Sequence, residues 1–182
     1  MVLFFLLGRA LLVKTALFLR LHDGECGDTV VSQVENVATV SVKKKKNVRL
    51  VNTPGHPRVS NHWAAIAEAS SVSCVVFVGG ALSPEAADMR TSKVPVLVFC
   101  NKADLASAIP ADCIAAELER ELQQIRDTSS TTGDEDEDIV APGSDHDAKF
   151  SFTNSALPVS FASGSVRTGN IDPILLFIRS HC

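Results

Sequence analysis

The sequence predicts an α/β fold with a doubly wound, mostly parallel sheet, and three observations support this prediction. Short, unbroken apolar runs at residues 2–7, 74–78 and 94–100 are typical of strands that are buried on both faces of a sheet. Segments with helical character alternate with these runs along the chain. The length of 182 residues suits a single domain that buries most of its apolar surface.

The first third of the chain predicts a strand, a helix and a hairpin. The strand at residues 2–7 is followed by a helix over residues 14–21. Two further strands, at residues 34–42 and 47–52, flank the lysines 43–46 and give the sheet one antiparallel hairpin strand. We expect these lysines to form a solvated turn, and contact with acidic lipid headgroups or RNA is the alternative.

The remainder of the chain continues the alternation. A helix is expected around Trp63, and the space between the buried strands at 74–78 and 94–100 holds only two or three helical turns, so the fold is shortened there. An amphipathic helix over residues 109–127 presents one apolar stripe. The stripe consists of Ile114, Leu118, Leu122 and Ile125.

The end of the chain predicts an insert, a strand and a closing helix. Residues 128–148 are acidic and poor in apolar side chains, so we expect a flexible insert within an otherwise single domain of residues 1–182. A strand over residues 157–163 and a helix over residues 170–182 follow. Asp172 and Pro173 suit the cap and first turn of that helix.

Charge and cysteine usage narrow the class of protein. The net charge of −4 gives no global indication of nucleic-acid binding. The five cysteines form no C-x-x-C pair, so we expect reduced thiols in an intracellular protein, with Cys74 and Cys100 in the core. The apolar N-terminus contains Arg9, Lys14 and Arg20, which argue against a membrane span, and a targeting segment is the alternative.

The segment GRALLVKT, residues 8–15, follows the first strand and resembles the phosphate-binding pattern G-x-x-x-x-G-K-[ST]. Gly8, Lys14 and Thr15 match the pattern, whereas Val13 stands in place of its second glycine. Such a loop aims backbone N–H groups and a lysine at phosphates, and its hydroxyl binds Mg²⁺. On this segment alone, two interpretations stay open: a nucleotide site with a defect, and a chance match in which a strand that ends in glycine is followed by a helix that carries a lysine.

A second motif, NKAD, follows the strand at residues 94–100. The Asp104 carboxylate can accept hydrogen bonds from N1–H and the exocyclic amine of guanine, a donor pair that adenine lacks. Asn101 would hold the loop and contact the base edge, and the stem of Lys102 would cover one face of the base. The position at the carboxyl edge of the sheet favours a guanine site over a plain polar loop.

A third motif, NTPGH, occupies residues 52–56. In the pattern D-x-x-G, the Asp binds Mg²⁺ through water and the Gly N–H contacts the γ-phosphate. Asn52 replaces that Asp and removes one negative charge, so we expect weakened Mg²⁺ binding. Three motifs in this order, each at the end of a strand, predict a P-loop fold of the small-GTPase type.

The chain resembles one branch of the small GTPases, the β subunit of the signal recognition particle receptor. The resemblance rests on TVVSQ (29–33), NTPGH, VLVFCNKAD (96–104) and FSFTNSALPVSFASGS (150–165), and it spans nearly the whole chain. Arf-type relatives have G-G-Q where this chain has P-G-H. The resemblance implies a GTP- and Mg²⁺-binding subunit that docks the N-terminal domain of the receptor α subunit. It also implies a location on the cytosolic face of the endoplasmic reticulum membrane and a role in co-translational protein targeting.

The resemblance also implies roles for individual residues. Thr15, with Thr29 or Ser32, would face the Mg²⁺, and His56 stands where many GTPases carry the water-orienting Gln, so hydrolysis is expected to be slow or absent. In ASGS, Ser163 and Gly164 occupy the place of the family's S-A-K loop in an altered form. The implied nucleotide contacts are Gly8, Val13, Lys14, Thr15, Gly55, Asn101, Lys102, Asp104, Ser163 and Gly164.

The chain departs from the family pattern at several positions. Val13 brings a branched side chain into the phosphate loop, and the backbone strain expected there corresponds to about a tenfold to hundredfold loss of affinity. Gly79 and Gly80 stand where the family usually has Asp-Ser. The family's transmembrane anchor has no counterpart in this sequence. We expect it upstream of Met1 in a longer protein, the alternative being a lost anchor with membrane contact through the partner.

Three functions are therefore compared. The leading hypothesis is a GTP-binding receptor subunit that hydrolyses GTP slowly and uses the bound state to hold the α subunit. The second is a nucleotide-free pseudo-GTPase scaffold with the same partner, motivated by Val13 and Asn52. The third is an Arf-like trafficking GTPase, motivated by the lysines 43–46 and the apolar N-terminus. None of the three predicts direct contact with nucleic acid.

Overall fold

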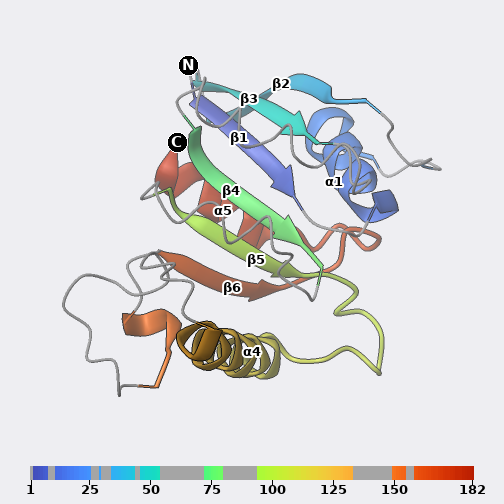
Figure 1. Cartoon of the computed structure of the whole chain (residues 1–182). Helices are drawn as coiled ribbons and strands as arrows, with labels where there is room; N and C mark the ends of the chain where they lie inside the picture. Colours follow the sequence, from blue (N-terminus) through green and yellow to red (C-terminus); the bar gives the residue numbers. More distant parts are fainter. Residues whose placement is uncertain are drawn as a thin grey trace.

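A computed structural model gives the fold of the chain. It describes residues 2–7, 11–25, 29, 34–43, 46–53, 72–79, 94–132, 149–154 and 158–182. In this part of the chain, six strands form one sheet in the order β2-β3-β1-β4-β5-β6 (Figure 1). The order places β1 between β3 and β4, so the chain continues to one side of β1 first and then to the other.

The strand pairing confirms the predicted doubly wound, mostly parallel sheet. The parallel strands are β1 (Val2–Leu7), β3 (Lys46–Asn52), β4 (Val72–Val78), β5 (Val96–Cys100) and β6 (Val159–Ser163). β2 (Asn36–Lys43) is the antiparallel member and forms the hairpin with β3, with Lys43 opposite Lys46 at its turn. The shortened connection falls in residues 80–93, outside the described residues.

Helices cover both faces of this sheet. α1 (Leu11–Asp23) and α5 (Asp172–His181) pack on one face, and α4 (Ala111–Thr132) packs on the other near β6 (Figure 1). A short 3₁₀ helix, η3 (Phe152–Asn154), precedes β6. None of the helices in the described part of the chain combines the length and apolarity needed to span a bilayer.

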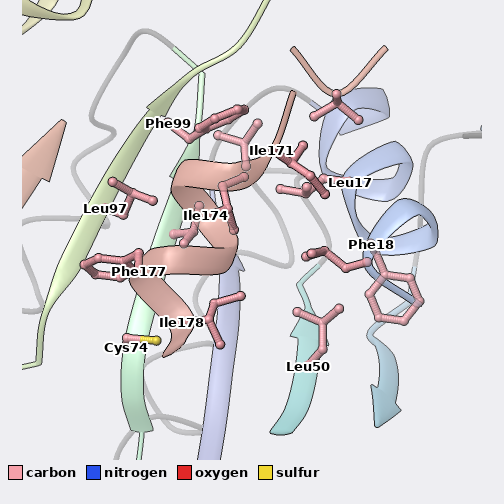
Figure 2. Packing of buried hydrophobic residues seen from close by; sticks show 14 of the residues in the cluster. Leu17, Phe18, Leu50, Cys74, Leu97, Phe99, Ile171, Ile174, Phe177 and Ile178 are labelled. Atoms are coloured by element: carbon pink, nitrogen blue, oxygen red, sulfur yellow. The ribbon is translucent and has the colours of Figure 1, made fainter. Parts of the chain in front are cut away.

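The larger core lies between α1, α5 and the sheet. Leu17 of α1 and Ile174 of α5 are completely buried there, and Figure 2 shows Phe99 of β5 beside Ile171 at the start of α5. Alternate residues of each strand face this core because successive strand side chains point to opposite faces. Thus Val48 and Leu50 of β3 face α1 and α5, whereas Val51 faces the opposite core.

The smaller core lies under α4. The helix buries less of its apolar stripe there than the sequence predicts. Leu118 is buried, Ile114 and Leu122 are half-buried, and Ile125 is exposed. The apolar contact of α4 with the sheet therefore ends before Ile125. Glu119 anchors the helix further, because its Oε1 accepts hydrogen bonds from the Ser151 hydroxyl at 2.9 Å and the Phe152 N–H at 2.8 Å.

Two boundaries differ from those expected. α4 continues through residues 128–132, where a flexible insert was predicted, and the Thr128 hydroxyl donates to the Gln124 carbonyl at 2.8 Å within the helix. The rest of that insert, residues 133–148, lies outside the described residues, as does the helix expected around Trp63. In α5 the capping position is Ile171, so Asp172 is the first helical residue, followed by Pro173. Its carboxylate still lies at the positive end of the helix dipole.

Candidate functional site

The carboxyl ends of the parallel strands form one edge of the sheet, where three of the predicted motifs begin. α1 follows β1 there, Asn52 and Thr53 end β3, and Asn101 follows β5. In sheets of this kind, ligands bind outside the carboxyl ends of the strands where the strand order reverses. The order of this sheet reverses at β1, so the topology brings the predicted phosphate loop to that point.

Lys14 is the buried cation of this edge. Only 2% of it is exposed, and its Nζ donates a hydrogen bond to the Thr53 carbonyl oxygen at 2.9 Å. Burial lowers the pKa of Lys14 from 10.5 to about 8. The hydrogen bond ties the first turn of α1 to the residue after β3, and it leaves a desolvated positive charge where the sequence predicts phosphates.

Val13 lacks the backbone strain that the sequence predicts for it. It lies within α1, and it is absent from the positive-φ residues of the described chain. Its half-buried side chain packs against the larger core. The strain predicted for Val13 is therefore wrong, because the helix already begins at Leu11 and a β-branched residue adopts helical backbone angles readily. Any cost of Val13 to phosphate binding must come from its volume.

Asn52 brings an unpartnered polar side chain to the same edge. It is 0% exposed, and neither its Oδ1 nor its Nδ2 has a hydrogen-bond partner among the described residues. It lies two residues after Leu50 and so on the strand face that α1 covers. A buried amide without a partner costs about 1–3 kcal/mol, so a group that completes its hydrogen bonds would bind favourably here.

These residues fit a hydrated Mg²⁺ in part. An amide oxygen at Asn52 can accept a hydrogen bond from a metal-bound water, and Thr15, next to Lys14 in α1, carries a hydroxyl of the kind that binds Mg²⁺ directly. The amide lacks the charge of a carboxylate, which weakens the attraction for the cation. Among the described residues, no group of three or more His, Cys, Asp and Glu side chains is placed to hold a metal.

Thr29, one of the two predicted switch residues, lies beside the start of α1. Its hydroxyl donates to the Leu12 carbonyl oxygen at 3.3 Å. Leu12 is one residue before Val13 and two before Lys14 in the sequence, so this contact brings Thr29 to the predicted phosphate side. Ser32, the alternative residue, lies outside the described residues, and so do Gly8, Gly55, His56 and Gly80.

The loop after β5 is fastened to the loop after β6. The Val166 N–H donates to Asn101 Oδ1 at 2.9 Å, and the Ala103 N–H donates to the Gly164 carbonyl at 3.0 Å. Between these contacts, Lys102 is exposed and has a φ of 67°, in the left-handed region that costs a non-glycine residue roughly 1 kcal/mol or more. Asn101 therefore holds the two loops together, as the sequence suggested.

Asp104 is directed toward the second of these loops. A hydrogen bond from Ser165 is the largest cause that lowers the pKa of its carboxyl group, with smaller contributions from its own backbone N–H and from the charges of Arg167 and Lys102. The Ser165 hydroxyl oxygen also accepts from the Thr168 N–H at 3.2 Å. These interactions favour the ionised form of the Asp104 carboxylate, which lies exposed at the surface.

Ser165 is the residue that sequence reasoning missed. The prediction assigned this loop to Ser163 and Gly164, but Ser163 is the last residue of β6 and pairs with Cys100, whereas Ser165 contacts Asp104. The sequence SVR, residues 165–167, follows at the position predicted for the S-A-K loop. The sequence does contain this second serine, two residues after Ser163. The residue at which β6 ends decides which of the two serines reaches Asp104.

Gly164 and Arg20 fix the shape of this second loop. A Cβ at Gly164 would collide with the Asn170 carbonyl oxygen and would lie 2.6 Å from the Phe99 ring, so a larger residue does not fit there. Arg20 of α1 donates through Nη2 to the Arg167 carbonyl at 3.2 Å. The helix that carries Lys14 therefore also supports the loop that carries Ser165.

The buried position of Lys14 predicts a specific pH dependence of stability. The pKa is about 8 in the folded state and 10.5 in the unfolded state, so between these values the unfolded chain binds more protons. Stability therefore rises with pH across this window, by up to about 3 kcal/mol, and the penalty is fully present below it. Urea unfolding of nucleotide-free protein between about pH 7 and pH 10 measures the rise.

The Lys14→Met variant should lack this rise, because the side chain no longer ionises. Lys149→Met, at an exposed lysine, is the matched control and should keep the wild-type pH profile. Identical pH profiles for the wild type and Lys14→Met would show that the Lys14 ammonium carries no folding penalty.

Comparison with known proteins agrees with this geometry. A family model described as the signal recognition particle receptor beta subunit matches residues 2–86 and 84–159. The signal recognition particle receptor subunit beta of Rattus norvegicus is 30% identical over 179 residues, which cover 87% of this chain. The chain spans 66% of the length of that rat protein.

Solved structures give the same assignment of fold. The structure of the mammalian SRP receptor superimposes with a TM-score of 0.77 and 25% identity, covering 100% of both chains. An SRb-GTP/SRX complex from Chaetomium thermophilum superimposes with a TM-score of 0.70 and 20% identity, covering 99% of this chain and 98% of the other. The chain thus has a small-GTPase-like fold and belongs to the signal recognition particle receptor beta subunit family.

Proposed function

We propose that this chain binds GTP and uses the bound state to dock the receptor α subunit during protein targeting at the endoplasmic reticulum. The observation that carries the proposal is the arrangement of Asp104, Ser165 and Asn101 at the carboxyl edge of the sheet. An ionised, oriented carboxylate beside two interlocked loops suits a base that offers two adjacent N–H donors, and guanine is such a base.

The phosphate side of the proposed site is formed by α1. The buried Lys14 ammonium supplies positive charge in a desolvated setting, where attraction to a phosphate is stronger than in water. The amino end of α1 adds the positive end of a helix dipole. In the apo chain, Lys14 Nζ donates to the Thr53 carbonyl, and a bound phosphate would offer it a charged acceptor at the same edge.

Magnesium would accompany the nucleotide. Thr15 would bind the metal through its hydroxyl and Asn52 would orient a metal-bound water, and the ion would neutralise part of the phosphate charge. Because Asn52 is neutral, we propose that the ion binds more weakly than to a site with a carboxylate. A weak metal and His56 in place of a water-orienting Gln both support slow hydrolysis, so docking is the primary role.

The proposed partner surface lies beside the nucleotide edge. Val34 and Val37 are 69% and 45% exposed, and they flank Asn36, which pairs with Asn52 in the register of β2 and β3. β2 is an edge strand of the described sheet, and the pairing of Asn36 with Asn52 puts its start, with the exposed Val34 and Val37, beside the carboxyl end of β3. The Chaetomium thermophilum relative of the same fold is described in complex with GTP and SRX, which supports a nucleotide-dependent partner for this chain.

A nucleotide-free scaffold is the second candidate, and two observations favour it. The volume of Val13 occupies the first turn of α1, and the Asn52 amide lacks the charge that holds a metal tightly. In this reading the Lys14–Thr53 hydrogen bond is the permanent partner of the ammonium. The family match supports the receptor subunit over the Arf-like alternative.

Binding of a fluorescent GTP analogue in the presence of Mg²⁺ tests the first candidate. Wild-type protein should bind it saturably with a Kd in the micromolar range or below, and GTP should compete whereas ATP should not. Asp104→Ala should weaken binding by about tenfold to a hundredfold, because guanine then loses a charged acceptor. Fluorescence anisotropy titration measures each Kd.

Val13→Gly separates the two candidates. A gain in affinity of about tenfold or less would mean that Val13 only crowds a working site. Binding that occurs in Val13→Gly and not in the wild type would support the scaffold, and absence of binding in both would contradict the proposed guanine site. Asp112→Ala, at an exposed carboxylate in the first turn of α4, is the matched control and should bind as the wild type does.

The partner surface is tested with charge substitutions. Val34→Asp combined with Val37→Asp should weaken capture by the N-terminal domain of the receptor α subunit by tenfold or more, because burial of an unpaired carboxylate is costly. Leu176→Asp, at a 63% exposed position of α5, is the control and should leave capture unchanged. Equal capture by both variants would place the docking surface elsewhere.

A further inference from the structure

Two cysteine thiols lie close together at the end of the sheet opposite the proposed nucleotide site. The Sγ atoms of Cys74 and Cys182 lie 3.8 Å apart, although the residues are separated by 108 positions in the sequence. Cys74 lies near the start of β4 and is 0% exposed, within the larger core. Cys182 follows the last turn of α5 and is half-buried.

The positions of both residues are fixed by the fold. Cys74 is paired with Phe4 in the register of β4 with β1, and Figure 2 shows it beside the last turns of α5, near Phe177 and Ile178. The Cys182 N–H donates to the Ile178 carbonyl at 2.8 Å, which caps α5. The chain end therefore lies beside the start of β4 (Figure 1).

The two sulfurs differ in reactivity because they differ in burial. Burial raises the pKa of the Cys74 thiol, and the neighbouring Cys182 adds to the rise through its charge and the hydrogen bond between the sulfurs. Cys74 therefore stays protonated, and a hydrogen bond in which either sulfur can donate joins it to Cys182. Cys182 is the less buried residue of the pair, so its sulfur is the one expected to meet a dissolved oxidant first.

We propose that Cys74 and Cys182 form a reversible disulfide that fastens the end of α5 to β4 when the protein meets hydrogen peroxide. The Cys182 sulfur attacks one peroxide oxygen, which gives a sulfenic acid and one water. The Cys74 sulfur then displaces the hydroxyl of that sulfenic acid, forming the S–S bond, and its proton leaves with the hydroxyl as a second water. The two thiols lose two electrons, and the peroxide is reduced to two waters.

The geometry favours closure of this disulfide over further oxidation. Cys182 is the residue after α5, so a change in its side-chain rotamer can bring the sulfurs together without moving the strand. The buried Cys74 is already in contact, so the sulfenic acid meets a thiol before a second peroxide. The disulfide closes a loop of more than 100 residues, which restricts the unfolded chain strongly.

Mass spectrometry after oxidation tests the proposal. The full chain is treated with a small excess of hydrogen peroxide, alkylated and digested without reduction. The expected product is a cross-linked pair of peptides that contains Cys74 and Cys182 and disappears after dithiothreitol. The oxidised protein should unfold at a Tm roughly 5–10 °C higher than the reduced protein, and dithiothreitol should reverse the rise.

Two variants provide the controls. Cys182→Ser should lose both the cross-linked peptide and the rise in Tm, with an unchanged circular dichroism spectrum in the reduced state. Cys113→Ser removes an exposed thiol on α4 and should keep both. The proposal is overturned if peroxide links Cys26 or Cys113 in preference to Cys74, or if Cys182 is carried to the sulfinic acid while Cys74 stays a thiol.

Discussion

The proposed nucleotide site depends on a buried cation at the carboxyl edge of the sheet. Lys14 is almost completely enclosed, and a single carbonyl, that of Thr53, accepts its hydrogen bond among the contacts described. A desolvated ammonium without a carboxylate is an unfavourable element of a core, and the lowered pKa of Lys14 reflects this. An anion at this edge would offset the cost, which is why we propose that phosphate binds here.

The parallel sheet places the loops of the proposed site next to one another. Because β5 and β6 are parallel neighbours, their carboxyl ends lie side by side, and Asn101 and Ser165 can join the two loops that follow them. Arg20 connects α1 to the second loop. α1 thus carries Lys14 in its first turn and, through Arg20, supports the loop after β6, which links the two halves of the proposed nucleotide site.

The sequence was sufficient for the doubly wound sheet and for the order of the described strands and helices, and it also places Asn101 and Asp104 directly after a buried apolar strand. The sequence was insufficient for features that depend on the exact residue at which a helix or strand begins or ends. Ser163 and Ser165 are equivalent in composition, and only the pairing of Ser163 with Cys100 shows that β6 ends before Ser165. Val13 looked strained in a loop, and it is unstrained because α1 begins at Leu11.

Hydrogen–deuterium exchange with and without GTP and Mg²⁺ tests the central claim most directly, because it reports on the backbone of each segment separately. The account predicts slower exchange at the first turns of α1 and in both loops, residues 101–105 and 164–170, with no change where Cys74 and Cys182 meet. Unchanged exchange in these segments at saturating GTP would contradict the claim that one nucleotide joins α1 to the two loops.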